Sequence, residues 1–234
     1  MVTKISENYQ NKPSVPHRKV ITPSSLYKAN CPRCTWMSYW HGFSLPVNMA
    51  LQQKMARLQE NSFDGISTQK ISPDLPDGWT TLHKGKFSSL PLPVNGNNAG
   101  WKLYGELDLL SKNSDGSFSI IDGKVSMKND PTDLVSSYWT QLEAYVYMLE
   151  NPEVGTKKEI ATIGLLQWKL TETFNDSLNI IGFQVEQKYI PVDRNPEKFL
   201  SFMENFISVL DGDFPNESPE CRDCALLKDL RFYE

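Results

Sequence analysis

Two carboxylates and a lysine stand close together within residues 100–128, a stretch whose alternating apolar residues predict strands. Asp122 and Lys124 are two positions apart, so both side chains project from the same face of an extended strand. The Asn-Ser-Asp-Gly sequence at 113–116 is typical of a tight turn, so we predict a hairpin. In that hairpin Asp108 lies opposite Asp122 or its immediate neighbour, with cross-strand Cβ atoms roughly 5 Å apart.

Such a pair of carboxylates favours a bound cation. Two carboxylates at this distance repel each other, and one would be partly protonated unless a cation lay between them. A divalent metal would keep both charged, and Lys124 could then orient a metal-bound water. The alternative is structural: Asp122-Gly123 ends a strand, and the aspartates are solvated surface residues.

All four cysteines fall in two Cys-x2-Cys pairs, Cys31 with Cys34 and Cys221 with Cys224, near opposite ends of the chain. Neither pair follows a strand into a helix of a βαβ unit, so a thioredoxin-like redox motif is not indicated. Two thiolate pairs that converge on one site suit zinc or an iron–sulfur cluster. Such a site would tie the N-terminal helices to the C-terminus, and four reduced structural thiols are the alternative.

The elements that must position these residues follow from helix and strand patterns. A helix is predicted to begin at Thr22-Pro23, and an amphipathic helix over about 48–61 has a buried stripe that includes Met55 and Leu58. Residues 63–98 are rich in Pro, Gly, Asp and Ser, so we expect an irregular excursion with at most short strands. Further helices are expected over 130–150 and from Pro196 to just before Gly212, and strands over 160–170 and 178–192.

Gln141 is an unusual member of the apolar stripe of the 130–150 helix, which also contains Leu142 and Tyr145. A buried glutamine needs hydrogen-bond partners. It is therefore either a satisfied amide at the helix edge or a side chain directed into a functional site.

Composition limits the classes of function. Lys and Arg number 24 against 28 Asp and Glu, which argues against a broadly basic nucleic-acid-binding surface but not against an acidic, metal-loaded cleft. No apolar run reaches about 18 residues, so no membrane span is expected. Residues 1–20 are polar without the hydrophobic stretch of a signal peptide, and we predict a flexible tail followed by a single domain over 21–234. The protein is expected in the cytoplasm, where disulfides are disfavoured.

The order of these motifs resembles the PD-(D/E)XK nuclease superfamily. A strand with Gly-x-x-Asp at 105–108, a hairpin, the sequence Asp122-Gly123-Lys124 and a helix with Gln-Leu-Glu-Ala-Tyr at 141–145 follow one another as in the RecB-type branch. Cysteines at both ends of the core are similar to those of iron–sulfur nucleases in that branch, including CRISPR-associated RecB-like exonucleases and the AddB nuclease domain. The resemblance covers about residues 22–228.

The resemblance implies an α/β (α+β) fold with a restriction-endonuclease-like core, in which helices flank a central mixed β-sheet. The segment at about 63–98 would be an irregular insertion in that domain. The resemblance also implies that the two termini are joined by a four-cysteine site that holds a [4Fe-4S] cluster, or Zn²⁺ as the alternative. Its ligands would be Cys31, Cys34, Cys221 and Cys224.

The resemblance further implies a catalytic site. Asp108, Asp122 and the backbone carbonyl of Gly123 would bind Mg²⁺ or Mn²⁺. Lys124 would position or activate the attacking water and stabilise charge on the phosphate. Two further side chains would support the site and contact the DNA backbone, Gln141 and Tyr145.

Two features depart from the usual pattern of the family. The position of Gly123 usually holds an aromatic or β-branched residue, so glycine is expected to loosen the strand there. Many RecB-type nucleases carry a His on the upstream helix, and the helix predicted here has none. Gln53 or Glu60 would replace it, or only one metal ion would bind tightly. His41, just after the first cysteine pair, is expected to be structural.

Three functions follow from these observations. The favoured one is a metal-dependent, exonuclease-like DNA nuclease that acts on single-stranded DNA or duplex ends with protein partners in DNA processing, such as DNA repair or CRISPR systems. The second is a catalytically inactive nuclease fold that serves as a DNA-binding or assembly subunit. The third is a metal-stapled protein with no role on nucleic acid, which the acidic charge balance supports.

Overall fold

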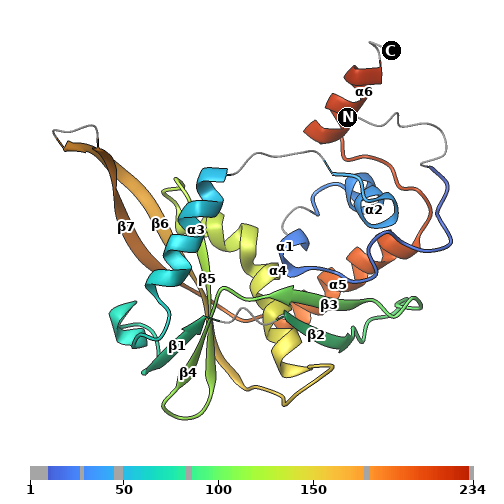
Figure 1. The fold of residues 1–234 in the computed structure, drawn as a ribbon. Coiled ribbons are helices and arrows are strands. Elements are labelled where there is room, and N and C mark those ends of the chain that lie inside the picture. Colours follow the sequence, from blue (N-terminus) through green and yellow to red (C-terminus); the bar gives the residue numbers. More distant parts are fainter. Residues whose placement is uncertain (1–9, 27–28, 45–49, 83–85, 177–179, 232–234) are drawn as a thin grey trace.

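A computed structural model describes residues 10–26, 29–44, 50–82, 86–176 and 180–231 (Figure 1). Its centre is a five-stranded sheet in the order β1-β4-β5-β6-β7. β5 and β6 are parallel, and the other neighbouring pairs are antiparallel, so the predicted mixed sheet is confirmed. The strands are β1 (Gly78–Leu82), β4 (Leu109–Asn113), β5 (Phe118–Val125), β6 (Ile160–Asp176) and β7 (Ile180–Val192).

Helix α4 (Pro131–Glu150) provides the crossover that the parallel pair β5 and β6 requires. It begins where predicted, because Asp130 accepts a hydrogen bond from the backbone N–H of Thr132 and proline follows the cap. Helix α5 (Pro196–Asp211) lies beside α4. None of the helices in the described ranges has the length and apolar character needed to cross a membrane.

Both faces of the sheet are covered. Ile120 packs in the larger apolar cluster with residues of α4 and α5, whereas Ile121 packs in a smaller cluster with Phe63. This period of two is expected of a strand buried on both sides. Asp122 therefore faces the side of α4, and Gly123 faces the opposite side, where helix α3 (Ala50–Ser62) lies against β5.

The first strand of the predicted hairpin is in fact two strands in two sheets. β3 (Lys102–Glu106) pairs with β2 (Lys86–Pro91), whereas β4 pairs with β1 and β5. The chain crosses from one sheet to the other at Leu107 and Asp108. Leu107 and Leu109 are both buried, so the alternation of apolar residues continues through the break and conceals it in the sequence.

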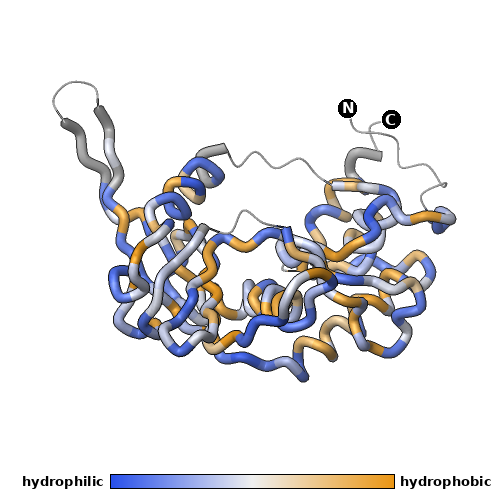
Figure 2. Tube along the Cα trace, turned by 60° about the horizontal axis from the view of Figure 1, so that its bottom comes forward, coloured by the Kyte–Doolittle hydropathy of each residue, from blue (hydrophilic) through white to orange (hydrophobic). Residues whose placement is uncertain are grey.

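Three other elements differ from the prediction. α1 (Pro23–Leu26) is a single turn. β6 continues to Asp176, because it pairs with β7 beyond the rest of the sheet and forms an arm that projects from the molecule (Figures 1 and 2). Leu58, expected in the buried stripe of α3, is 54% exposed, while its neighbour Gln59 is buried. The reason is that this turn of α3 faces the backbone of Gly123 rather than an apolar surface.

The N-terminal segment is anchored to the end of α5 by α2 (Pro32–His41). The indole N–H groups of Trp36 and Trp40 donate to the backbone carbonyls of Gly212 and Leu210, at 3.2 and 2.7 Å. Hydrophobic and hydrophilic segments alternate along the chain in Figure 2, as expected for elements with one buried face.

Residues 10–20, part of the predicted flexible tail, lie along α2. The backbone N–H groups of His17 and Arg18 donate to the carbonyls of Trp40 and Tyr39. Residues 1–9 of that tail lie outside the described part of the chain.

Candidate active site and cysteine metal centre

Asp108 and Asp122 meet where the pairing of β4 with β5 ends. Leu109 lies opposite Ile121 in the antiparallel register, so the next position along each strand carries an aspartate. The backbone N–H of Gly123 donates to Asp108 Oδ2 at 2.9 Å. The predicted position of Asp108, beside Asp122 and its neighbour, is confirmed.

Lys124 lies on the same face of β5 as Asp122. Its Nζ forms an ion pair with Asp122 Oδ2 and lies 4.6 Å from the centroid of the Tyr138 ring. The Asp122 side chain is 1% exposed and that of Lys124 is 16% exposed. The ammonium is therefore largely removed from water and paired with a carboxylate.

Gln141 joins Asp122 to Tyr145. Its Nε2 donates to Asp122 Oδ1 at 3.1 Å and to the Tyr145 hydroxyl at 2.9 Å. Gln141 and Tyr145 are each only 4% exposed. Their burial favours the supporting role that the resemblance implies over direct contact with a DNA backbone.

Glu143, within the same helical motif, belongs to a different part of the molecule. It is buried, and its carboxylate accepts a hydrogen bond from the backbone N–H of Asn195, just before α5. Arg194 lies 4.0 Å from it and pairs with Glu150. This group ties α4 to the start of α5 and is structural.

Burial and crowding of charge change the protonation of the site. Burial, followed by the neighbouring charge of Asp122, raises the pKa of Asp108 to about 8. Burial alone would lower the pKa of Lys124, but the charges of Asp122 and Asp108 outweigh burial and raise it. At neutral pH the metal-free site therefore holds a protonated Asp108 beside the Asp122–Lys124 ion pair.

We predict that Mg²⁺ binding strengthens as the pH rises toward 8. The cation must displace the Asp108 proton, so below the pKa of about 8 each pH unit should weaken apparent affinity about tenfold. The raised pKa has the opposite effect on the metal-free fold: its stabilising contribution is full below about pH 4 and is lost as the pH rises through about 8. Calorimetric titration with Mg²⁺ between about pH 6 and about pH 9 measures the affinity.

Asp108→Asn is the matched control for that titration, because it cannot release a proton. It should bind Mg²⁺ weakly and without this pH dependence. A wild-type affinity that stays constant between about pH 6 and about pH 8 would contradict the assignment of Asp108 as a ligand.

Gln59 is buried over Gly123, beside this site, and was not singled out in the sequence. It is 1% exposed, and its Nε2 donates to the backbone carbonyl of Leu166 at 2.7 Å. Two residues of α3 were proposed from the sequence as substitutes for a histidine. Gln53 is exposed. Glu60 lies near enough to Asp108 for its charge to help raise the pKa of Asp108. The unusual glycine at position 123 could have indicated that a side chain packs over it. Identifying that side chain as Gln59 would have required knowing that α3 packs on β5.

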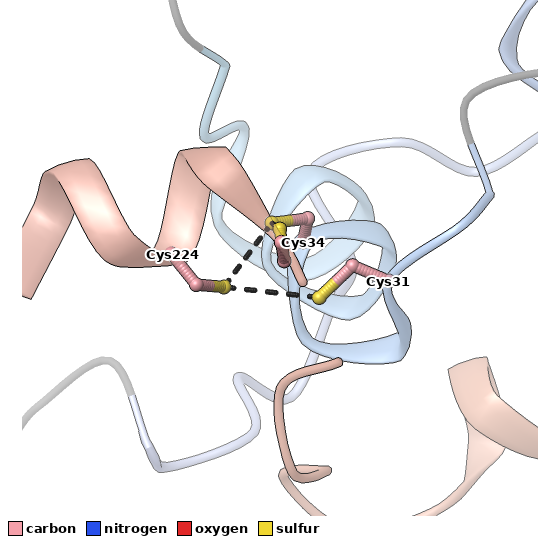
Figure 3. A group of neighbouring side chains, drawn as sticks. Cys31, Cys34 and Cys224 are labelled. Carbon is pink, nitrogen blue, oxygen red and sulfur yellow. Dashed lines mark hydrogen bonds between the residues drawn. The ribbon is translucent and has the colours of Figure 1, made fainter. Parts of the chain in front are cut away.

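The second predicted site lies where α2 meets α6 (Arg222–Arg231). The four sulfur atoms of Cys31, Cys34, Cys221 and Cys224 lie within 4.8 Å of one another. Figure 3 shows three of these side chains converging, with Cys224 Sγ 3.7 Å from Cys31 Sγ and 3.5 Å from Cys34 Sγ. The predicted convergence of the two pairs is confirmed. His41 packs against Trp36 with ring centroids 5.4 Å apart.

The chemistry of these thiols fits a bound metal. Burial, followed by the neighbouring thiols, raises the pKa of Cys34. Burial would also raise the pKa of Cys31, but the N–H of Ser218 and the other sulfurs outweigh it and lower that pKa to about 7. Four thiolates so close together require a cation, and a set of four sulfur donors suits zinc or an iron–sulfur cluster.

A cavity of about 1130 Å³ lies between the cysteines and the first half of α4. Tyr138, which contacts Lys124, lines this cavity together with Trp139 of α4 and Phe202 of α5. The cavity therefore lies beside the cysteine site, and Tyr138 separates it from Lys124.

A comparison with known protein families agrees with this geometry. A model of the PD-(D/E)XK nuclease superfamily matches residues 50–228, which include β4, β5 and α4. A solved structure described as "Crystal structure of SSO0001" is similar over 91% of this chain and 84% of its own, with 14% identity and a TM-score of 0.47. A search of curated proteins found no match.

Proposed function

The chain belongs to the PD-(D/E)XK nuclease superfamily, and from this premise we propose that it is a metal-dependent DNA nuclease that hydrolyses phosphodiester bonds. The observation that carries the proposal is the group formed by Asp108, Asp122 and Lys124 at one end of β5. It combines carboxylate oxygens with a desolvated ammonium, which are the groups needed to hold a divalent cation beside a phosphate.

The residues fit Mg²⁺ or Mn²⁺. Asp108 and Asp122 offer hard oxygen ligands, and the carbonyl of Gly123 would add another. A bound divalent cation would relieve the repulsion that raises the pKa of Asp108. Such an ion supplies a Lewis acid for the phosphate and a bound water of lowered pKa.

The protein's own side chains would position the attacking water and the metal-binding carboxylate, and would neutralise charge on the phosphate. Lys124 offers N–H donors to the attacking water or to a phosphate oxygen, and its charge would stabilise the negative charge that develops there. Gln141 holds one carboxylate oxygen of Asp122, and Tyr145 in turn accepts from Gln141. This chain of hydrogen bonds keeps the carboxylate in one orientation.

We propose that the substrate is single-stranded DNA or a frayed duplex end, so that cleavage is exonuclease-like. The cavity beside Tyr138, Trp139 and Phe202 supports this proposal, since aromatic faces stack on the unpaired bases of a single strand. Lys198 lies over the Trp139 ring at 4.4 Å and would add a cation near the backbone. Within the superfamily, the terminal cysteines and the Gln-x-x-x-Tyr helix support placement in the RecB-type, iron–sulfur branch, and a role with protein partners in DNA repair or CRISPR systems in the cytoplasm.

We propose that the cysteine site holds a [4Fe-4S] cluster or a zinc ion. The resemblance to iron–sulfur nucleases supports the cluster. The sulfur separations of 3.5–3.7 Å support a single ion, since Zn–S bonds of about 2.3 Å place tetrahedral sulfurs about 3.8 Å apart. Anaerobically purified protein should be brown with broad visible absorption if it holds a cluster, and colourless with zinc by elemental analysis otherwise.

A nuclease assay tests the proposed function. Linear and circular DNA, each single- and double-stranded, is incubated with the protein and Mg²⁺ or Mn²⁺, with a chelator in parallel. We expect cleavage of linear single strands or frayed ends that requires the metal and spares circles. Cleavage of circles would show an endonuclease. DNA binding at low salt without cleavage would support an inactive DNA-binding subunit, and no binding would favour a protein without a nucleic-acid role.

A further inference from the structure

Gln59 carries a buried oxygen atom that has no hydrogen-bond partner within the described part of the chain. The carbonyl of Leu166 can only accept, so the amide nitrogen of Gln59 must face it, and Oε1 is turned the other way. Among the described residues, no group donates a hydrogen bond to that oxygen. A buried acceptor left unpaired costs about 1–3 kcal/mol, and such atoms often mark the place of an ion or water.

Gly123 makes the room for this oxygen. A Cβ added at position 123 would lie 2.6 Å from Gln59 Oε1 and 3.6 Å from Asp108 Oδ2. The φ angle of Gly123 is not in the left-handed region, so its backbone could accommodate other residues. Glycine therefore leaves the space that this amide oxygen occupies, and a Cβ here would push the flexible end of the Gln59 side chain away from its position.

We propose that Gln59 Oε1 is a ligand of the divalent cation held by Asp108 and Asp122, and that Gly123 admits it. This inference rests on the proposed metal-dependent function. An amide oxygen makes the donor set all oxygen, which favours hard cations such as Mg²⁺ and Mn²⁺; an imidazole at this place would favour softer transition metals. Gln59 is thus the residue that sets the preference among metal ions, and Gly123 provides the space for its side chain.

Two substitutions separate this role from a structural one. Gln59→Met keeps the length of the side chain but removes both the oxygen and the donor to Leu166. Gln59→Glu keeps an oxygen at this place but replaces the donor to Leu166 by a second oxygen and adds a negative charge, which itself favours a cation. If Gln59 binds the cation, the Glu variant should bind metal at least as well as wild type and the Met variant should not. If Gln59 only ties α3 to β6, the two variants should be equally impaired.

The test is titration of metal-depleted protein with Mn²⁺, followed by paramagnetic resonance of the free ion. We expect about 10–100-fold weaker Mn²⁺ binding for Gln59→Met and for Gly123→Ala, with binding retained in Gln59→Glu. Gln59→His should shift preference from Mg²⁺ toward Co²⁺ and Ni²⁺. Gln53→Leu, on the exposed face of the same helix, is the matched control and should bind like wild type.

Wild-type affinity in Gln59→Met, or equal losses in the Met and Glu variants, would overturn the inference and leave the proposed nuclease intact. If the Asp122→Asn variant binds Mn²⁺ as tightly as wild type does, both this inference and the proposed metal-dependent nuclease are overturned. Thermal melting without metal identifies variants that fail to fold, and Gln59→Glu then decides the matter through its own affinity, because it retains the ligand.

Discussion

Lys124→Met should slow DNA cleavage by on the order of 10²–10⁴-fold, the range seen when a positioned proton-transfer or charge-stabilising group is removed. The methionine keeps an apolar stem of similar length but removes the ammonium that pairs with Asp122 and lies over the Tyr138 ring. Mn²⁺ binding should persist or strengthen, because the lysine no longer competes with the cation for that carboxylate. Single-turnover rates at saturating Mg²⁺ measure the chemical step.

The matched control is Lys112→Met, which removes an exposed lysine from β4. It should cleave DNA at the wild-type rate. Asp122→Asn should lose both cleavage and metal binding, so the two site variants separate loss of the ion from loss of the ammonium. Cleavage at the wild-type rate by Lys124→Met would show that the reaction takes place elsewhere or without this lysine.

Replacing Cys31 and Cys224 together by serine should remove the bound metal or cluster and destabilise both ends of the chain. Metal ligation at structural thiolate sites is worth on the order of 10–16 kcal/mol in apparent free energy, comparable to the whole stability of a domain. Both cysteines are buried, and they lie on segments that are otherwise far apart in the sequence. Metal analysis, thermal melting and limited proteolysis around α2 and α6 measure the loss.

Arg222→Ala is the control for this experiment, since Arg222 lies between the ligands of the second pair and is exposed. It should retain full metal content and the wild-type melting temperature. If the cysteine variant keeps its metal and its melting temperature, the four thiols are structural residues that bind no ion.

Local signals predicted much of the active site. Asp122 and Lys124 share a strand face because side chains alternate along any strand, and a tight turn before them required an antiparallel partner. Asp130 and Pro131 marked the start of α4 by capping chemistry that depends on adjacent residues alone. Gln141 was recognisable as a polar side chain on a buried face, and it contacts Asp122.

The break between β3 and β4 was not predictable in this way. Leu107 and Leu109 are buried in the same alternation that a single strand would show. Hydrophobic periodicity reports burial and does not report which neighbouring strand supplies the hydrogen bonds. That choice depends on β2 and β5, which pair with the two halves of the stretch from different sides.

The sequence by itself determined which chemistry this protein can carry. Carboxylates on two neighbouring strands, a lysine on the same face as one of them and two cysteine pairs are matters of residue type and short spacing, and the structure brings each group together. Only the tertiary structure decided that Gln59 rather than Gln53 is buried against β5 and that Gly123 leaves space for its side chain. The physical reason is that the space beside a glycine is filled by a side chain of the helix that packs against the strand. The rotation of that helix depends on its contacts with the sheet, which no local pattern in either segment contains.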